Sequence, residues 1–169
     1  FSNDGLTYFI ANESMKDPNG YDITVYKLET PFDIESLKED CSQDRFDLGT
    51  LARGDGSGPL ANGTLTSVWG KLYDMEFSAS GDKIFIVNGV SFLMQFSLSK
   101  PFDLSTASFD VYQDLDPNYG SLTFNREGTK MFWLEHTGDA TKVRTYETSS
   151  PFDISSLTLS HTLDLSSTE

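Results

Sequence analysis

FNREGTKMFWL (residues 124–134) and SPFDI (residues 150–154) decide the fold of this 169-residue chain, because close copies of both occur three times in the same order. The first of these, the Phe–Gly mark, reads FSNDG at 1–5, FSASG at 77–81 and FNREG at 124–128. The second, the Pro-Phe-Asp mark, reads TPFDI at 30–34, KPFDL at 100–104 and SPFDI at 150–154. Marks that recur together in this way indicate an internal repeat.

The second and third copies give the length of the repeat. Their Phe–Gly marks begin 47 positions apart, at residues 77 and 124, whereas the first two begin 76 positions apart, at residues 1 and 77. A period of 47 is typical of a four-stranded propeller blade, for which about 40–50 residues is usual. The longer spacing then contains an insertion.

The pattern within each copy is that of short strands. In the second copy, alternating or continuous apolar residues predict strands at 72–77, 84–87, 92–98 and 107–112. Asn88 and Gly89 predict a two-residue type I′ turn in the middle of that copy. The third copy predicts strands in the same order, at 121–124, 130–134, 143–148 and 157–163.

Glycine, proline and aspartate explain where these strands stop. The glycine of the Phe–Gly mark tolerates the positive φ of a tight turn between the first two strands of a blade. The proline removes a ladder donor after the third strand, and the aspartate two residues later caps a single helical turn. We expect the phenylalanine between them to pack between neighbouring blades; the three are Phe32, Phe102 and Phe152.

The sequence therefore predicts one all-β domain, a β-propeller-type repeat of about three four-stranded antiparallel blades. Three blades are fewer than the roughly four to eight that close a ring. We expect a partial propeller, either an excerpt of a longer chain, which is favoured, or a unit that closes by self-association. The predicted boundaries are about 1–48 for blade 1, 49–69 for an inserted loop, about 70–115 for blade 2 and about 119–165 for blade 3.

Both marks resemble the FSPDGTKMFV…YxLSTPFDIS repeat of β-propeller-like proteins from bacteria and marine bacteriophages. The third copy is the most similar to that repeat, and the resemblance covers nearly the whole chain apart from about residues 49–69. It implies a repeat scaffold in a long surface or virion protein, hence an extracellular, cell-surface or virion location. It brings no catalytic motif.

Charge excludes several classes of partner. The chain has 12 Lys and Arg against 26 Asp and Glu, for a net charge of −14 and a pI near 4.3. Nucleic acids and anionic membranes attract basic surfaces, so neither is expected as a partner. No apolar run approaches the roughly 18 residues of a membrane-spanning helix, and the single cysteine, Cys41, has no partner for an internal disulfide.

Candidate binding residues fall on the connections that differ between copies, at the edge of the blades opposite the two marks. Variable loops on a rigid scaffold commonly carry binding. Three aromatic residues lie on or beside these connections: Trp69, Tyr21 and Tyr119. Aromatic rings that have acids and amides nearby can stack on sugars. The alternative is that these rings pack at the rim of the blade. Arg53 and Asp55 flank a glycine in an adhesion-type tripeptide, which a Gly-rich loop also produces by chance.

Two further signals in these connections concern modification and metals. Asn12 and Asn62 begin N-glycosylation sequons in predicted loops, with ordinary turn residues as the alternative. The acidic runs at 17–22 and 114–118 loosely suggest calcium, but neither has the spacing or the distal glutamate of a calcium loop, and turn formation explains them better. The sequence predicts no metal site and no cofactor, and leaves calcium as an open alternative.

Catalytic signatures are absent from the sequence. Only two histidines occur, His136 and His161, so one chain cannot supply a three-histidine metal site. There is no Gly-x-Ser-x-Gly elbow and no phosphate-binding Gly-x-x-x-x-Gly-Lys loop. The chain is therefore predicted not to be an enzyme.

The resulting expectation is an exposed, non-enzymatic repeat module of a phage tail or fibre, or of a microbial surface protein. It would act in attachment, with a carbohydrate or a cell-surface receptor as ligand and with other blades or a second copy as neighbours. One alternative is a structural assembly unit of an extracellular filament or virion that binds no ligand. The other is a propeller hydrolase or lactonase with a metal in its central channel.

Overall fold

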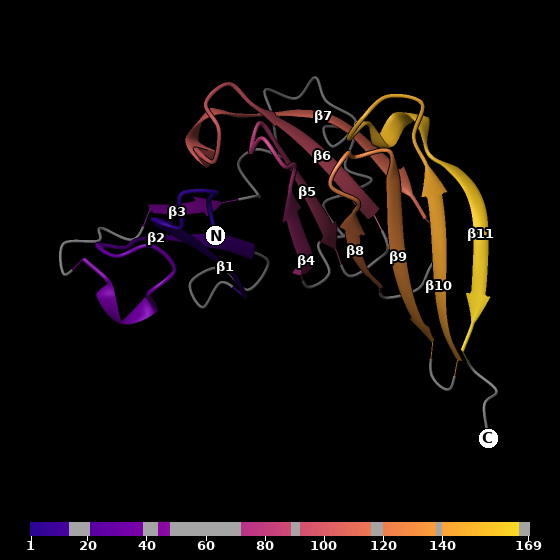
Figure 1. Ribbon diagram of the computed structural model, residues 1–169, viewed down its shortest axis with the longest axis horizontal. Helices are drawn as coiled ribbons and strands as arrows, with labels where there is room; N and C mark the ends of the chain where they lie inside the picture. Colours follow the sequence, from indigo (N-terminus) through magenta and orange to yellow (C-terminus); the bar gives the residue numbers. More distant parts are fainter. Residues whose placement is uncertain are drawn as a thin grey trace.

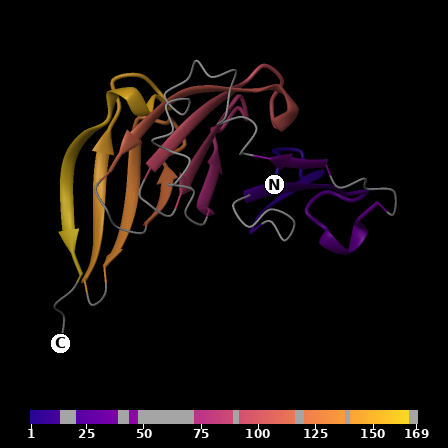
Figure 2. The ribbon, with the colours of Figure 1, turned by 180° about the vertical axis from the view of Figure 1, so that it is seen from behind.

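Three antiparallel β-sheets lie side by side along an arc and make up the regular structure of the chain (Figure 1). The computed structural model describes residues 1–13, 21–38, 44–47, 72–88, 92–115, 120–137 and 140–165. Within those ranges the chain forms strands and single turns of 3-10 helix, without an α-helix. The view from behind shows the same succession of sheets, with the N-terminus in the first and the C-terminus beyond the last (Figure 2).

Each sheet is built from strands that are consecutive in the chain. The first has the order β1-β2-β3, the second β4-β5-β6-β7 and the third β8-β9-β10-β11, and all neighbours are antiparallel. The first sheet comprises β1 (Thr7–Glu13), β2 (Tyr21–Lys27) and β3 (Asp44–Asp47). The second comprises β4 (Leu72–Phe77), β5 (Lys83–Asn88), β6 (Phe92–Leu98) and β7 (Ala107–Asp114). The third comprises β8 (Gly120–Phe124), β9 (Lys130–Thr137), β10 (Ala140–Glu147) and β11 (Thr158–Asp164).

This architecture confirms the predicted fold class. Two sheets have the four consecutive antiparallel strands of a propeller blade, and the described part of the first sheet has three. The inserted loop at 49–69 lies outside the described residues, as does Gly89 of the predicted type I′ turn.

Strand limits differ from the prediction mainly in the third sheet. β9 continues beyond residue 134 to Thr137, and β10 starts at Ala140, because the two strands pair along a long hairpin that ends with Ala140 opposite Thr137. The periodicity of apolar residues does not report this extension, since His136, Thr137 and Thr141 are polar. β11 begins at Thr158, because Leu157 closes the preceding 3-10 turn.

The core lies between the sheets, and β5 shows how it is divided. Ile84 and Ile86 pack toward the first sheet, in a cluster that includes Phe9 and Ile23. Phe85, which alternates with them, packs toward the third sheet in a second cluster. A strand buried on both faces reads as a continuous apolar run, which is why residues 84–87 show no polar alternation.

Aromatic contacts across each boundary confirm the expected role of two Pro-Phe-Asp phenylalanines. The ring of Phe102 lies 5.2 Å from that of Phe77, which in turn lies 4.7 Å from Phe9 of the first sheet. In the next boundary the ring of Phe152 lies 5.4 Å from Phe124 and 6.4 Å from Phe85 of the second sheet.

For Phe32 the same expectation is wrong in this structure. Its ring lies 5.5 Å from that of Phe1, but the side chain is 61% exposed. The reason is geometric: the described residues place no sheet against that face of the first sheet.

We predict that Gly81→Ala destabilises the fold more than Gly5→Ala does. Both glycines have positive φ, and a Cβ at either would overlap the ring of the phenylalanine that follows, Phe102 or Phe32. Phe102 is partly buried and packs against the core cluster, so we expect a loss of about 2–4 kcal/mol at Gly81, from left-handed backbone strain together with overpacking. The exposed Phe32 is free to move aside, which leaves about 1–2 kcal/mol of backbone strain at Gly5. Denaturant titration of the two variants checks this order, and equal losses would contradict it.

Candidate functional site

The two sequence marks meet at one edge of each sheet and form a single structural unit. The backbone N–H of Phe102 donates to the carbonyl of Gly81 at 2.9 Å, and the same bond joins Phe32 to Gly5 and Phe152 to Gly128. All three phenylalanines have positive φ, between 56° and 61°, which non-glycine residues seldom adopt. The marks recur together because each requires the other. We call this edge the mark edge.

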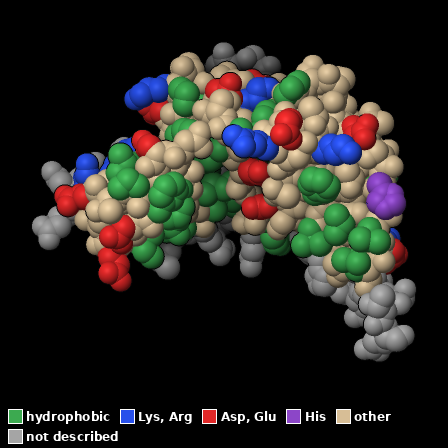
Figure 3. Space-filling model, in the orientation of Figure 1, with side chains coloured by type: hydrophobic (Ala, Val, Ile, Leu, Met, Phe, Trp, Pro, Cys, Tyr) green, Lys and Arg blue, Asp and Glu red, His purple; other side chains and the backbone are tan. Residues whose placement is uncertain are grey.

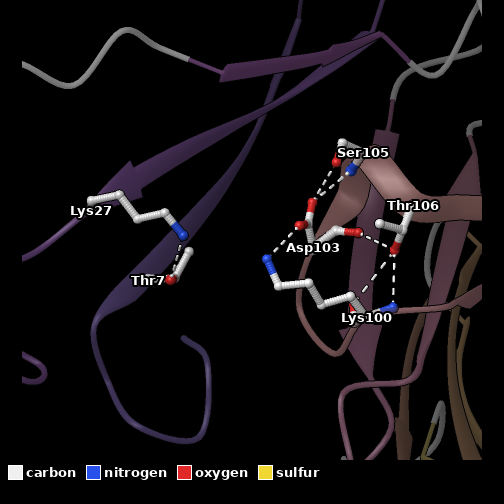
Figure 4. Close-up of polar contacts among 6 residues, drawn as sticks. All are labelled: Thr7, Lys27, Lys100, Asp103, Ser105 and Thr106. Carbon is white, nitrogen blue, oxygen red and sulfur yellow. Dashed lines mark hydrogen bonds and ion pairs between the residues drawn. The ribbon is translucent and has the colours of Figure 1, made fainter.

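Polar groups at the mark edge are satisfied locally. Asp103 Oδ1 accepts from Ser105 N at 3.2 Å and from Ser105 Oγ at 2.6 Å, while its other oxygen accepts from Lys100 Nζ at 3.0 Å (Figure 4). The Ser105 hydroxyl, followed by Lys100, lowers the pKa of Asp103 below its usual value. Thr106 Oγ1 donates to the carbonyl of Asp103 at 2.8 Å. The predicted capping role of this aspartate is confirmed in all three copies, at Asp33, Asp103 and Asp153.

The candidate binding residues are predicted to lie at the opposite edge, which we call the variable edge. Tyr21 begins β2, where its backbone pairs with that of Glu13, and its side chain lies outside the described residues. Most of the other candidates also fall outside the described residues, so their predicted roles stay predictions: Trp69, Tyr119, Arg53, Asp55 and Asn62.

Asn12 was expected in a loop, and this expectation is wrong. The structure places Asn12 in β1, opposite Asp22 of β2, because the hairpin pairing continues to the pair Glu13–Tyr21.

As to metals, the described parts of the chain hold no group of three or more His, Cys, Asp or Glu side chains arranged to bind an ion. Most of the acidic run at 17–22, much of the run at 114–118, and Cys41 lie outside those parts.

Two carboxylates that the sequence analysis did not single out lie between the second and third sheets. Asp74 and Glu76 are alternate residues of β4 and point toward β8. Asp74 Oδ2 accepts the backbone N–H of Leu122 at 2.8 Å. The carboxylate of Glu76 accepts the N–H of Phe124 at 3.1 and 3.3 Å and the hydroxyl of Thr123 at 3.2 Å.

Burial raises the pKa of both Asp74 and Glu76, although the hydrogen bonds from β8 act in the opposite direction. A pair of carboxylates with raised pKa values on an inner strand is a common sign of acid–base chemistry. Here, however, each carboxylate binds a backbone amide of the adjacent sheet, so its position is explained by its role in joining β4 to β8. The alternation of polar residues in 72–77 was the only sequence signal for this pair.

Two more side chains of the second sheet bind the Pro-Phe-Asp turn of the third. Gln95 Oε1 accepts the backbone N–H of Ile154 at 3.1 Å, and its Nε2 donates to Asp110 at 2.9 Å. Lys83 Nζ donates to the carbonyl of Phe152 at 3.0 Å. These bonds fix the turn of one blade on the side chains of the blade before it.

Comparisons with known proteins support the fold alone. No family model and no curated protein matches the sequence. A structure of unknown function from Desulfotomaculum acetoxidans matches with a TM-score of 0.51 at 13% identity, over 95% of this chain and 39% of that one. The β-propeller domain of Cps50 (Swd1) from Myceliophthora thermophila has a TM-score of 0.51 at 11% identity, over 87% and 41%.

A third similar structure is a candidate 6-phosphogluconolactonase from Bacteroides fragilis, with a TM-score of 0.50 and 8% identity over 96% of this chain and 45% of that one. The chain thus spans about two fifths of the length of each of these structures. Together they identify a β-propeller-like arrangement of blades.

Within the described residues, no helix has the length and apolar character needed to cross a membrane.

We predict that the Asp74→Asn, Glu76→Gln double variant gains stability relative to the wild type as the pH rises. A carboxyl group with a raised pKa holds its proton more tightly in the folded state, so it weakens the wild type as the pH rises from its ordinary pKa of 3.8 or 4.5 through the raised value. The amides do not ionise and escape this loss. Melting temperatures of both proteins from about pH 4 to about pH 7 measure the difference.

Asp103→Asn serves as the control with the opposite sign. The lowered pKa of Asp103 means that its carboxylate stabilises the fold above the ordinary value of 3.8, and that this contribution is lost as the pH falls. The variant should therefore lose stability relative to the wild type as the pH rises. If the melting temperatures of the double variant and the wild type differ by the same amount at every pH, Asp74 and Glu76 are hydrated and the prediction is contradicted.

Proposed function

We propose that this chain is a non-enzymatic binding module, carried by a repeat protein of the bacterial and marine-phage type at a cell surface or on a virion. One observation carries the proposal. The recurring side chains are used in structure at the mark edge, whereas the ends of the hairpins at the variable edge have a different sequence in each copy. These ends are Glu13 and Tyr21, Asn88 and Phe92, and Thr137 and Ala140.

A rigid set of sheets that carries dissimilar hairpin ends is suited to recognition, because the scaffold limits the entropy lost on binding. The mark edge in contrast offers few free groups, since its aspartates, hydroxyls and amides are paired with one another. This contrast supports a ligand at the variable edge.

A neutral carbohydrate is the ligand class that these residues favour. Tyr21, Trp69 and Tyr119 supply aromatic rings for stacking against sugar faces, and neighbouring acids and amides supply partners for hydroxyl groups. The net charge of −14 disfavours acidic polymers. Arg53 and Asp55 provide a further pair of charges for a surface receptor.

We predict that the purified chain binds neutral glycans on an array and that Trp69→Ala weakens binding about two- to tenfold, since one lost ring contact removes about 0.5–1.5 kcal/mol. Tyr8→Ala is the matched control, because Tyr8 is a partly exposed aromatic residue at the start of β1, at the mark edge and away from the hairpin ends. It should bind as the wild type does. An array without bound glycan, or equal losses for the two variants, would contradict the proposal.

A further inference from the structure

We propose that the exposed face of the third sheet binds the exposed face of the first sheet of a second copy of this chain, head to tail. The head face consists of Phe1, Phe32, Ile34 and Leu37, and the tail face consists of Phe132, Leu134, Val143 and Leu163. This inference does not depend on the binding function proposed above. It rests on the two boundaries that already exist within the chain.

Both internal boundaries bury or partly bury the same three positions of the following sheet. These are the phenylalanine of the Phe–Gly mark, the phenylalanine of the Pro-Phe-Asp mark and the apolar residue two positions after it. That last residue is Leu104 in the second sheet and Ile154 in the third, with exposures of 3% and 0%. Leu104 belongs to a buried cluster that includes residues of the first sheet, and Ile154 belongs to one that includes residues of the second sheet.

The head face presents the same three positions, and no sheet formed by the described residues covers them. The tilted rings of Phe1 and Phe32 contact each other as those of their counterparts do, but both side chains are exposed. Ile34, the counterpart of Leu104 and Ile154, is 54% exposed. Leu37, whose counterparts Ala107 and Leu157 pack against the two clusters, is also exposed.

The tail face presents the positions with which, at each internal boundary, the earlier sheet contacts the sheet that follows it. Phe132 and Leu134 of β9 correspond in the repeat to Phe85 and Val87 of β5, both of which are fully buried against the third sheet. Val143 corresponds to Leu93, and pairs with Leu134 on one side.

Cross-strand pairs extend this apolar row to the outer strand. Val143 lies opposite Leu163 of β11 on its other side, and cross-strand partners share one face of a sheet. Leu134 and Leu163 are both about half exposed. Hydrophobic side chains are visible over the first and the last sheet at the two ends of the molecule (Figure 3).

The donor of a polar contact at the internal boundary also has a counterpart in the third sheet. Lys83, which donates to the carbonyl of Phe152 in the following sheet, corresponds to Lys130 of the third sheet. Lys130 makes a long, exposed ion pair of 3.8 Å with Glu147, which is worth little and leaves the ammonium group able to bind elsewhere. The carbonyl of Phe32 of a second copy is its expected partner.

The two faces are different from each other and complementary, so the contact is heterologous. Two copies joined at both contacts would supply six sheets, within the roughly four to eight that close a propeller. A net charge of −14 on each copy opposes association, and salt screens this repulsion. A second copy is therefore expected to bind more tightly at higher ionic strength.

Sedimentation equilibrium of the 169-residue chain tests the proposal, with Leu134→Glu as the variant. The wild type should show species of at least twice the 18.8 kDa chain mass, increasing with salt, and Leu134→Glu should be a monomer. Leu159→Glu is the matched control: Leu159 is 49% exposed and pairs with Tyr146, which faces the second sheet, so it lies on the opposite face from the tail residues. It should associate as the wild type does.

A mixing experiment tests the head-to-tail arrangement. Ile34→Glu should be monomeric because its head face is disrupted, although its tail face is intact. Leu134→Glu has a disrupted tail face and an intact head face. Mixed in equal amounts, the two should form a one-to-one pair. A wild type that stays monomeric at high concentration and high salt, a mixture that stays monomeric, or equal loss of association in Leu159→Glu and Leu134→Glu would each overturn the proposal. Circular dichroism of each variant confirms that it is folded.

Discussion

The contact between a phenylalanine ring and a glycine without a side chain is the constraint on which the rest of the structure depends. At Gly81 the positive φ of 75° and the ring of Phe102 over the glycine leave no space for a Cβ. The ring reaches this position only because Phe102 itself has the uncommon φ of 59°. Such strain, of the order of 1–3 kcal/mol per residue, is tolerated where surrounding contacts over-determine it. Here the hydrogen bond from Phe102 N to Gly81 O and the capped turn that follows supply those contacts.

From this contact the arrangement of neighbouring sheets follows. With its ring held over Gly81, Phe102 reaches Phe77 and through it the core shared with the first sheet. The same geometry at Phe152 reaches the second sheet. Each blade therefore carries its contact with the blade before it in its own turn, so that adjacent blades share a core.

The strands and the turn chemistry were predictable because they repeat. β4 and β6 have the predicted limits, and the three capping aspartates occupy the predicted place. What was not predictable occurs once. Asp74 and Glu76 bind β8, but the equivalent places in the third sheet are Ser121 and Thr123, so no repeated pattern marked the carboxylates. The length of the β9–β10 hairpin was missed for a related reason, since backbone pairing there continues through polar residues.

The carboxylates of β4 occupy backbone amides of β8, which is an edge strand of the third sheet. A bare edge strand displays a row of unpaired amides to which any extended peptide is able to add. In β8 the amides of Leu122 and Phe124 are already bound by Asp74 and Glu76. A strand arriving from another chain would have to displace two negatively charged acceptors to form a ladder. This arrangement protects the molecule against edge-to-edge aggregation at its centre without covering the strand.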